Sequence, residues 1–138
     1  MGWIVEIDPF DPGAPPRKRT ALGRFKHENA ALTLAKDNRA VVYMGDDQAN
    51  DYIYKFVSDD RYSADVPGRN RHLLESGTLY VAKFTAGATT GDMMGEGEWI
   101  PLKLDTATAD GGRLGDRFAD RGALLVDTRL AADAVGAT

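Results

Sequence analysis

Residues 40–57 read AVVYMGDDQANDYIYKFV, and they decide the fold class. The first run, residues 40–44, is rich in β-branched and aromatic side chains, which favour strands. The second run, residues 51–57, alternates between two faces, one of which carries the aromatic residues Tyr52, Tyr54 and Phe56. The turn signal Gly-Asp-Asp stands between the two runs. We therefore predict that they pair as antiparallel strands.

Shorter strand patterns, separated by turns rich in Gly and Pro, flank this pair. We predict further strands at residues 3–8, 20–25, 31–35, 77–84 and 99–102. Pro101 indicates that the last of these lies at the edge of a sheet, because proline cannot donate a hydrogen bond to a neighbouring strand. The glycine-rich residues 85–97 predict a flexible loop.

Near the C-terminus the pattern changes from strand to helix. Leu124, Ala131 and Val135 recur at helical spacing, and Gly136 stands where a helix would end. We predict one α-helix near residues 117–135. The chain is thus expected to be mainly β, and its short strands are typical of a sandwich, a barrel or the blades of a propeller. The spacing alone leaves these architectures open.

The amino-acid composition excludes several classes of functional site and partner. The chain has 138 residues, a net charge of −4, two His and no Cys, which suits one domain. Without Cys there is no disulfide framework, no Cys-ligated zinc site and no Cys nucleophile. The negative charge disfavours nucleic acid as a partner, and no apolar run approaches the ~20 residues of a membrane span. We find no signal-peptide pattern, no Gly-x-Ser-x-Gly elbow and no Walker loop.

A compact group of charged side chains, Arg24-Phe25-Lys26-His27-Glu28, is the first candidate site. If this segment alternates as a strand does, Arg24, Lys26 and Glu28 share one face. Cations beside a metal-binding carboxylate would suit an anionic substrate such as phosphate. The alternative is a solvated, charged strand edge, and the residue types leave both interpretations open.

The turn Gly45-Asp46-Asp47 is the second candidate site. Two adjacent carboxylates suit hard cations such as Ca²⁺, but Gly-Asp-Asp is also common turn chemistry. His72 stands in a polar stretch beside other charged residues, and we predict that it lies at the surface.

Several segments, in the same order from end to end, resemble the PhoX family of bacterial alkaline phosphatases. They are residues 2–9, 18–28, 41–47, 52–58, 77–84, 99–102 and 128–138. The resemblance implies a β-propeller with a cluster of ferric iron and calcium that hydrolyses phosphate monoesters, in a periplasmic or secreted protein. Family members are several times longer and carry a twin-arginine export signal and a Cys ligand to iron upstream. Residues 1–138 are therefore expected to be a segment of a larger β-propeller phosphatase domain.

The resemblance also implies roles for the first candidate site. Glu28 matches the glutamate of the family's Lys-His-Glu stretch and is implied to be a ligand of the metal cluster. His27 is expected either to orient the site or to pack beneath it. Arg24 and Lys26 are expected near the charge of the substrate, on the basis of residue type alone.

The two carboxylates of the turn, Asp46 and Asp47, match the family's Gly-Asp-Asp stretch and are secondary candidates, with a metal-binding or a structural role. One firmly matched ligand cannot retain iron or calcium against water. The isolated chain is therefore expected to bind these metals weakly or not at all and to lack phosphatase activity. Unpaired blade edges would favour self-association.

Two other functions remain open on the sequence. In the first, the chain is a non-catalytic β domain that binds a protein partner or an anionic ligand through residues 24–28. An independent domain of this kind is expected to be a monodisperse monomer. A third alternative is that the family fold is kept while the chemistry has changed, since β-propellers host unrelated functions.

Overall fold

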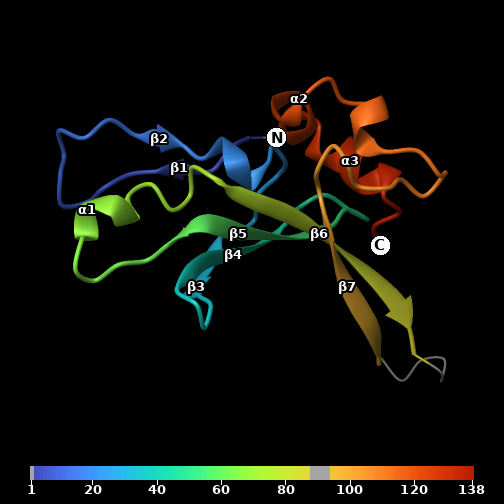
Figure 1. The fold of residues 1–138 in the computed structure, drawn as a ribbon, viewed down its shortest axis with the longest axis horizontal. Helices are drawn as coiled ribbons and strands as arrows, with labels where there is room; N and C mark the ends of the chain where they lie inside the picture. The colour runs from blue at the N-terminus through green and yellow to red at the C-terminus, as the bar shows by residue number, and fades with distance from the viewer. Residues whose placement is uncertain (1, 88–93) are drawn as a thin grey trace.

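The computed structural model describes residues 2–87 and 94–138 and shows a mainly β protein, as predicted. Five strands form one antiparallel sheet in the order β3-β4-β5-β6-β7, and two short strands form a second sheet (Figure 1). Each strand of the large sheet pairs with its neighbour in sequence, so this sheet is an up-and-down meander. Neither sheet closes into a barrel within the described ranges. The strands are β1 (Val5–Glu6), β2 (Arg17–Lys18), β3 (Ala31–Leu34), β4 (Arg39–Gly45), β5 (Ile53–Arg61), β6 (Gly77–Ala86) and β7 (Gly95–Pro101).

Short helices connect the strands, and the last two of them cover one face of the large sheet. They are η1 (Thr20–Leu22), α1 (Pro67–Asn70), η2 (Leu114–Asp116), α2 (Arg121–Val126) and α3 (Thr128–Ala134), of which η1 and η2 are 3-10 helices. The helices α2 and α3 lie together beside the sheet and close the main core (Figure 1). Of the helices that the structure describes, none is long and apolar enough to cross a membrane.

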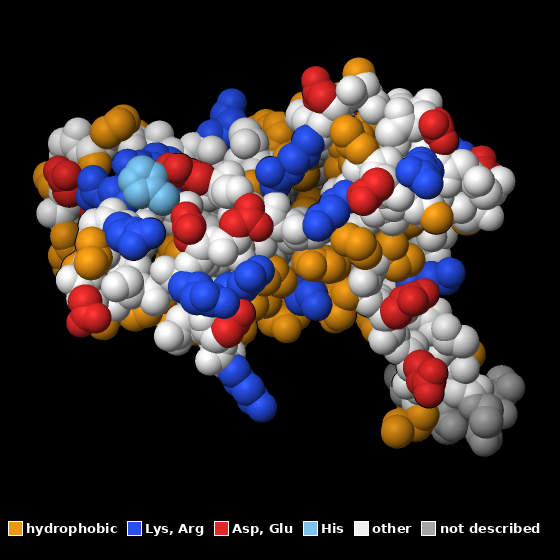
Figure 2. Space-filling view, in the orientation of Figure 1, with side chains coloured by type: hydrophobic (Ala, Val, Ile, Leu, Met, Phe, Trp, Pro, Cys, Tyr) orange, Lys and Arg blue, Asp and Glu red, His pale blue; other side chains and the backbone are white. Residues whose placement is uncertain are grey.

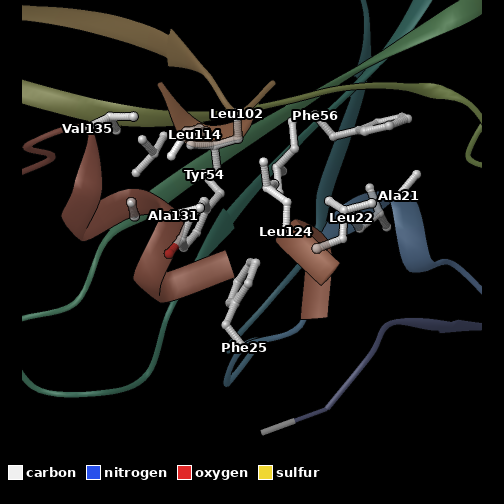
Figure 3. Close-up of a cluster of buried hydrophobic side chains, with 14 of the residues drawn as sticks. Ala21, Leu22, Phe25, Tyr54, Phe56, Leu102, Leu114, Leu124, Ala131 and Val135 are labelled. Atoms are coloured by element: carbon white, nitrogen blue, oxygen red, sulfur yellow. The ribbon is translucent and has the colours of Figure 1, made fainter. Parts of the chain in front are cut away.

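The main hydrophobic core lies between the large sheet and these two helices (Figure 3). Tyr54 and Phe56 of β5 are fully buried there, together with Leu124 of α2 and Ala131 of α3. Ile53, which points to the opposite face of β5, is 47% exposed. The alternation that we predicted for residues 51–57 is therefore confirmed.

The predicted antiparallel pairing of β4 with β5 is also confirmed, with Val42 opposite Phe56. On the other side of β5, Gly77 begins β6 and lies against the Phe56 ring. A Cβ at Gly77 would stand 2.3 Å from Val57 O and 2.4 Å from Phe56 Cζ, so only glycine allows this approach. The strand β7 forms an edge of the sheet, which confirms the position predicted from Pro101.

The strand predicted at residues 20–25 is wrong. Thr20–Leu22 is a 3-10 helix that ends at Gly23, whose φ of +80° favours glycine. This turn buries both Ala21 and Leu22, whereas a strand would send neighbouring side chains to opposite faces. Beyond the turn, Phe25 makes only an isolated bridge. The sequence pattern could not distinguish this compact turn from an extended segment.

The single helix predicted near residues 117–135 is also wrong, because α2 and α3 are separate helices that meet at Asp127. The Asp120 carboxylate caps α2 by accepting a hydrogen bond from Ala123 N at 2.8 Å, so helical structure begins later than predicted. Asp127 has φ −108° and ψ 44°, which is not helical. Thr128 Oγ1 donates to Leu125 O at 2.8 Å across this break. The apolar residues that suggested one long helix are nevertheless buried.

Two other elements differ in extent from the prediction. The strand expected at residues 3–8 is reduced to β1, which pairs only with the short β2. The loop expected at residues 85–97 is shorter, because β6 continues to Ala86 and β7 begins at its partner Gly95. Residues 88–93 of that predicted loop lie outside the described residues.

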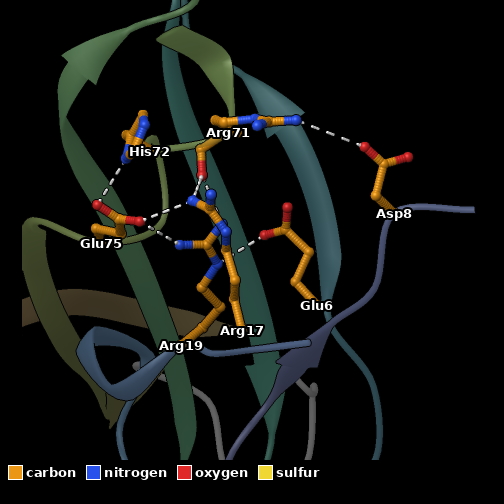
Figure 4. A network of polar contacts seen from close by, with 7 residues as sticks. All are labelled: Glu6, Asp8, Arg17, Arg19, Arg71, His72 and Glu75. Atoms are coloured by element: carbon orange, nitrogen blue, oxygen red, sulfur yellow. Dashed lines mark hydrogen bonds and ion pairs between the residues drawn. The ribbon is translucent and has the colours of Figure 1, made fainter. Parts of the chain in front are cut away.

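A buried arginine joins the small sheet to the turn that follows α1 (Figure 4). Arg19 is 2% exposed; its Nε donates to Glu6 Oε2 at 2.7 Å and its Nη1 donates to Glu75 Oε1 at 3.2 Å. Its Nη2 donates to Arg71 O at 2.6 Å. Three acceptors in three directions match the planar guanidinium group. His72, 2.8 Å from Glu75, is half exposed, which confirms its predicted place at the surface.

Leu124→Ala is expected to lower the free energy of unfolding by about 2–5 kcal/mol, because it leaves a cavity between α2 and the sheet. The matched control is Leu130→Ala on α3, where the side chain is 59% exposed, and it should change the stability by less than about 0.5 kcal/mol. Urea unfolding followed by circular dichroism measures both. Equal effects of the two substitutions would contradict the described core.

Arg19→Lys is expected to lower the free energy of unfolding by about 1–3 kcal/mol, since one ammonium group cannot reach all three acceptors of the guanidinium. Arg17→Lys is the control, because Arg17 contacts the same Glu75 and Arg71 O from a more exposed position, and it should cost less than about 1 kcal/mol. Chemical denaturation of both variants tests this. A cost for Arg19→Lys no larger than for Arg17→Lys would show that burial adds nothing to the network.

Candidate functional site

Backbone pairing brings the two candidate sites together, although they are far apart along the sequence. His27 and Asp46 form an isolated antiparallel bridge. On one side of the bridge Glu28 N donates to Gly45 O at 3.2 Å, and on the other side Asp47 N donates to Lys26 O at 2.8 Å. Residues 26–28 and 45–47 therefore form one small two-stranded unit at the end of β4. The residue types indicated each segment separately, but nothing in the sequence predicted their contact.

The side chains of this unit divide between its two faces. Lys26, Glu28 and Asp47 are exposed, whereas His27 and Asp46 point inward. Glu28 Oε2 lies 3.7 Å from the place where a Cβ on Gly45 would stand, so the Glu28 carboxylate leans over the glycine of the turn. The alternation predicted for residues 24–28 therefore persists across 26–28, even though these residues are not part of a regular strand.

The exposed face carries two carboxylates suited to a hard cation. Within residues 2–87 and 94–138, the side chains of Glu28 and Asp47 make no hydrogen bond or ion pair with another residue. Carboxylate oxygens are the ligands that calcium and ferric iron accept. The same described residues contain no group of three or more His, Asp or Glu side chains arranged around one point. The donor type fits a metal, but two carboxylates alone would make only part of a coordination shell.

Asp46 has both of its carboxylate oxygens bound by Arg129 of α3. Arg129 Nε donates to Oδ2 and Nη2 donates to Oδ1, each at 2.6 Å. The Asp46 side chain is fully buried, and that of Arg129 is 16% exposed. Asp51 Oδ2 lies 3.4 Å from Arg129 Nε, and Asp46 is the largest cause that raises the pKa of Arg129 above its ordinary value. Asp46 therefore has a structural partner, which sequence patterns did not indicate.

His27 lies beneath the exposed face and is packed among aromatic rings. Its ring centroid lies 3.7 Å from that of Phe25, which in turn stacks on Tyr54 at 4.3 Å. His27 Nε2 lies 3.0 Å from Gly23 O and carries the proton, since a carbonyl only accepts. Burial lowers the pKa of His27, so the ring is neutral at neutral pH. The His27 ring therefore packs beneath the exposed face, and a role in orienting the site stays a prediction.

Arg24 and Lys26 lie in different surroundings. Arg24 Nε donates to Val126 O at 2.9 Å, and its Nη2 lies 3.7 Å from Asp127, so this guanidinium holds the junction of α2 and α3. Lys26 is exposed and, with Asp47, borders a surface hollow of about 490 Å³ whose far wall is formed by residues 2–5. Only Lys26 of the two cations stays beside Glu28, and the substrate role of either remains a prediction.

A family model and a solved structure both match this chain over almost its whole length. The family model described as alkaline phosphatase PhoX matches residues 1–138. A solved structure, Pseudomonas fluorescens PhoX in complex with vanadate, a transition state analogue, is 54% identical to this chain, with a TM-score of 0.88. That match covers 99% of this chain and 23% of the other, so residues 1–138 span about a quarter of its length. No curated protein sequence matches the chain.

The resemblance inferred from seven short segments is thus confirmed by a match over every residue and by a similar three-dimensional structure. Proteins that share only a fold need not share their amino acids. Here more than half of the aligned residues are identical, and the backbone follows the same path. The chain belongs to the PhoX family of alkaline phosphatases.

Proposed function

We propose that this chain is part of a metal-dependent phosphatase that hydrolyses phosphate monoesters, and that Glu28 is one of the ligands of its metal centre. The observation that carries the proposal is the 54% identity, over 99% of this chain, with a PhoX that binds the transition-state analogue vanadate. The exposed Glu28 carboxylate at the bridge between residues 26–28 and 45–47 supports it, because it has the donor type and the accessibility of a ligand.

The other exposed residues of the unit extend this proposal. Asp47 lies opposite Lys26 in the pairing, on the same face as Glu28, and is the better second ligand, since Arg129 already holds both oxygens of Asp46. Lys26 supplies a positive charge beside the carboxylates, where it would attract an anionic ester. Iron and calcium, when bound, supply the charge that polarises a phosphoryl oxygen.

The activity belongs to a longer protein, we propose, of which residues 1–138 form one segment. This segment spans 23% of the related structure, and two carboxylates are too few to retain iron or calcium. The meander β3-β4-β5-β6-β7 supports a place in a β-propeller, whose blades are antiparallel sheets of consecutive strands. A periplasmic or secreted location follows from the family resemblance.

The alternative of a non-catalytic domain that binds a protein partner or an anionic ligand through residues 24–28 has less support. Arg24 is engaged at the α2–α3 junction, so these residues do not present one basic surface. On the face drawn in Figure 2, Lys and Arg side chains are interspersed with Asp and Glu. The net charge of −4 supports the expectation that nucleic acid is not the partner.

In the complete phosphatase, Glu28→Gln is expected to lower the turnover of p-nitrophenyl phosphate at least about 100-fold and to lower the metal content. Replacing a residue that only supports a ligand already lowers metal affinity or activity about 10–100-fold. Glu98→Gln on the edge strand β7 is the control, since Glu98 is exposed and lies away from residues 26–28. The isolated chain with added Fe³⁺ and Ca²⁺ should show no turnover above its own Glu28→Gln variant. Wild-type metal content in Glu28→Gln would refute the ligand role.

The isolated chain is expected to self-associate through its edge strands β3 and β7, along one side of which the part of the chain that the structure describes places no further strand. Leu32 on β3 is 60% exposed, which adds an apolar contact at that edge. Size-exclusion chromatography with light scattering over a range of concentrations measures this. Leu32→Lys should shift the chain toward the monomer, whereas a monodisperse monomer of the unaltered chain would favour the independent-domain alternative.

A further inference from the structure

We infer that Arg129 is a positioning residue for Glu28 and that it acts through Asp46. The inference rests on the proposed function, because it concerns how the proposed ligand is held. It assigns a role to two residues that never contact the exposed face of the site. The argument needs three links: a fixed Arg129, a fixed Asp46 and a backbone path from Asp46 to Glu28.

Arg129 is fixed because α3, which carries it, is anchored to the core. Ala131 and Ala132 of this helix are fully buried. A second contact lies one turn further along, where Tyr52 Oη donates to Asp133 Oδ1 at 2.5 Å. The guanidinium itself also donates to Gln48 Oε1 at 3.3 Å. The helix and residues 46–52 are therefore joined at more than one point, and Arg129 has little freedom to move.

Asp46 is fixed because its carboxylate is buried and bound at both oxygens. A buried carboxylate is strongly disfavoured unless it is paired, so Asp46 must stay against Arg129. The two parallel hydrogen bonds of 2.6 Å set the orientation of the side chain as well as its position. The Asp46 backbone is held too, since its N–H donates to Tyr52 O at 3.1 Å.

The path from Asp46 to Glu28 is short and runs through the backbone. The residues on either side of Asp46 make the two hydrogen bonds that join residues 45–47 to residues 26–28. Glu28 N bonds the carbonyl of Gly45, and the Glu28 carboxylate leans over the same glycine. This unit is an isolated bridge and not a long ladder. Its geometry therefore depends on the anchor at Asp46, and a displaced Asp46 would carry Gly45 and Asp47 with it.

A purely structural role for the ion pair makes a different prediction from a positioning role. If Arg129 only stabilises the fold, its replacement lowers the melting temperature but leaves the metal affinity of the folded protein unchanged. If Arg129 positions Glu28, the metal affinity falls even under conditions where the variant is fully folded. Calcium affinity at a temperature well below the melting transition separates the two roles.

The experiment uses the complete phosphatase, stripped of metal and titrated with Ca²⁺ by isothermal calorimetry. Arg129→Lys keeps the charge but loses the bidentate geometry, and it is expected to weaken Ca²⁺ binding about 10-fold, the effect typical of a residue that supports a ligand. Asp46→Asn should do the same. Arg117→Lys is the matched control, because Arg117 pairs with Asp110 in a different loop, and it should leave the affinity unchanged.

The double variant Asp46→Asn with Arg129→Gln leaves no buried charge without a partner. If the single variants do not fold, the Ca²⁺ affinity of this double variant tests the positioning role. Glu28→Gln is titrated in parallel. If Glu28→Gln weakens Ca²⁺ binding and the Asp46 and Arg129 variants bind as the wild type does, the positioning role is refuted while the proposed function stands. If Glu28→Gln itself binds Ca²⁺ normally, the proposed function fails. Weakened binding in all of them, with normal binding in Arg117→Lys, supports the inference.

Discussion

Burial of one face of β4 and β5 is the constraint on which the rest of this structure depends. The aromatic side chains of Tyr54 and Phe56 must leave water, and the sheet alone cannot cover them. The helices α2 and α3 provide that cover, with Leu124 and Ala131 directly in the core. Once α3 lies there, Arg129 is next to the turn that ends β4, so the same packing that removes the aromatic face from water also sets the position of the candidate site.

The turn Gly45-Asp46-Asp47 shows how one short segment serves two purposes. The carboxylate of its middle residue, Asp46, is buried and forms the ion pair with Arg129. The next residue, Asp47, is exposed. The paired residues 26–28 divide in the same way, with His27 inside and Glu28 outside. This division follows from the alternation of an extended backbone, and it places the exposed carboxylates of Glu28 and Asp47 on the face opposite to His27 and Asp46.

How much of the fold was predictable depended on whether the decisive contacts were local. The pairing of β4 with β5, the alternation along β5 and the edge position of β7 follow from residue type and spacing, and the structure confirms them. The turn at Gly23 and the break at Asp127 do not, because each is stabilised by contacts with distant residues. Gly23 packs against Leu79 and Thr128, and Arg24 N donates to both Leu125 O and Thr128 Oγ1.

The sequence by itself determined the mainly β fold class, the family and the two candidate segments, since these depend on residue types in a fixed order along the chain. It also singled out Glu28 as the leading candidate ligand, a role that stays a prediction. Only the tertiary structure decided that the two segments meet, that Arg24 belongs to the α2–α3 junction, and that Asp46 and Asp47 face opposite ways. The reason is physical: the partner of Asp46 lies 83 positions away, and only the packing of α3 on the sheet brings the two charges into contact.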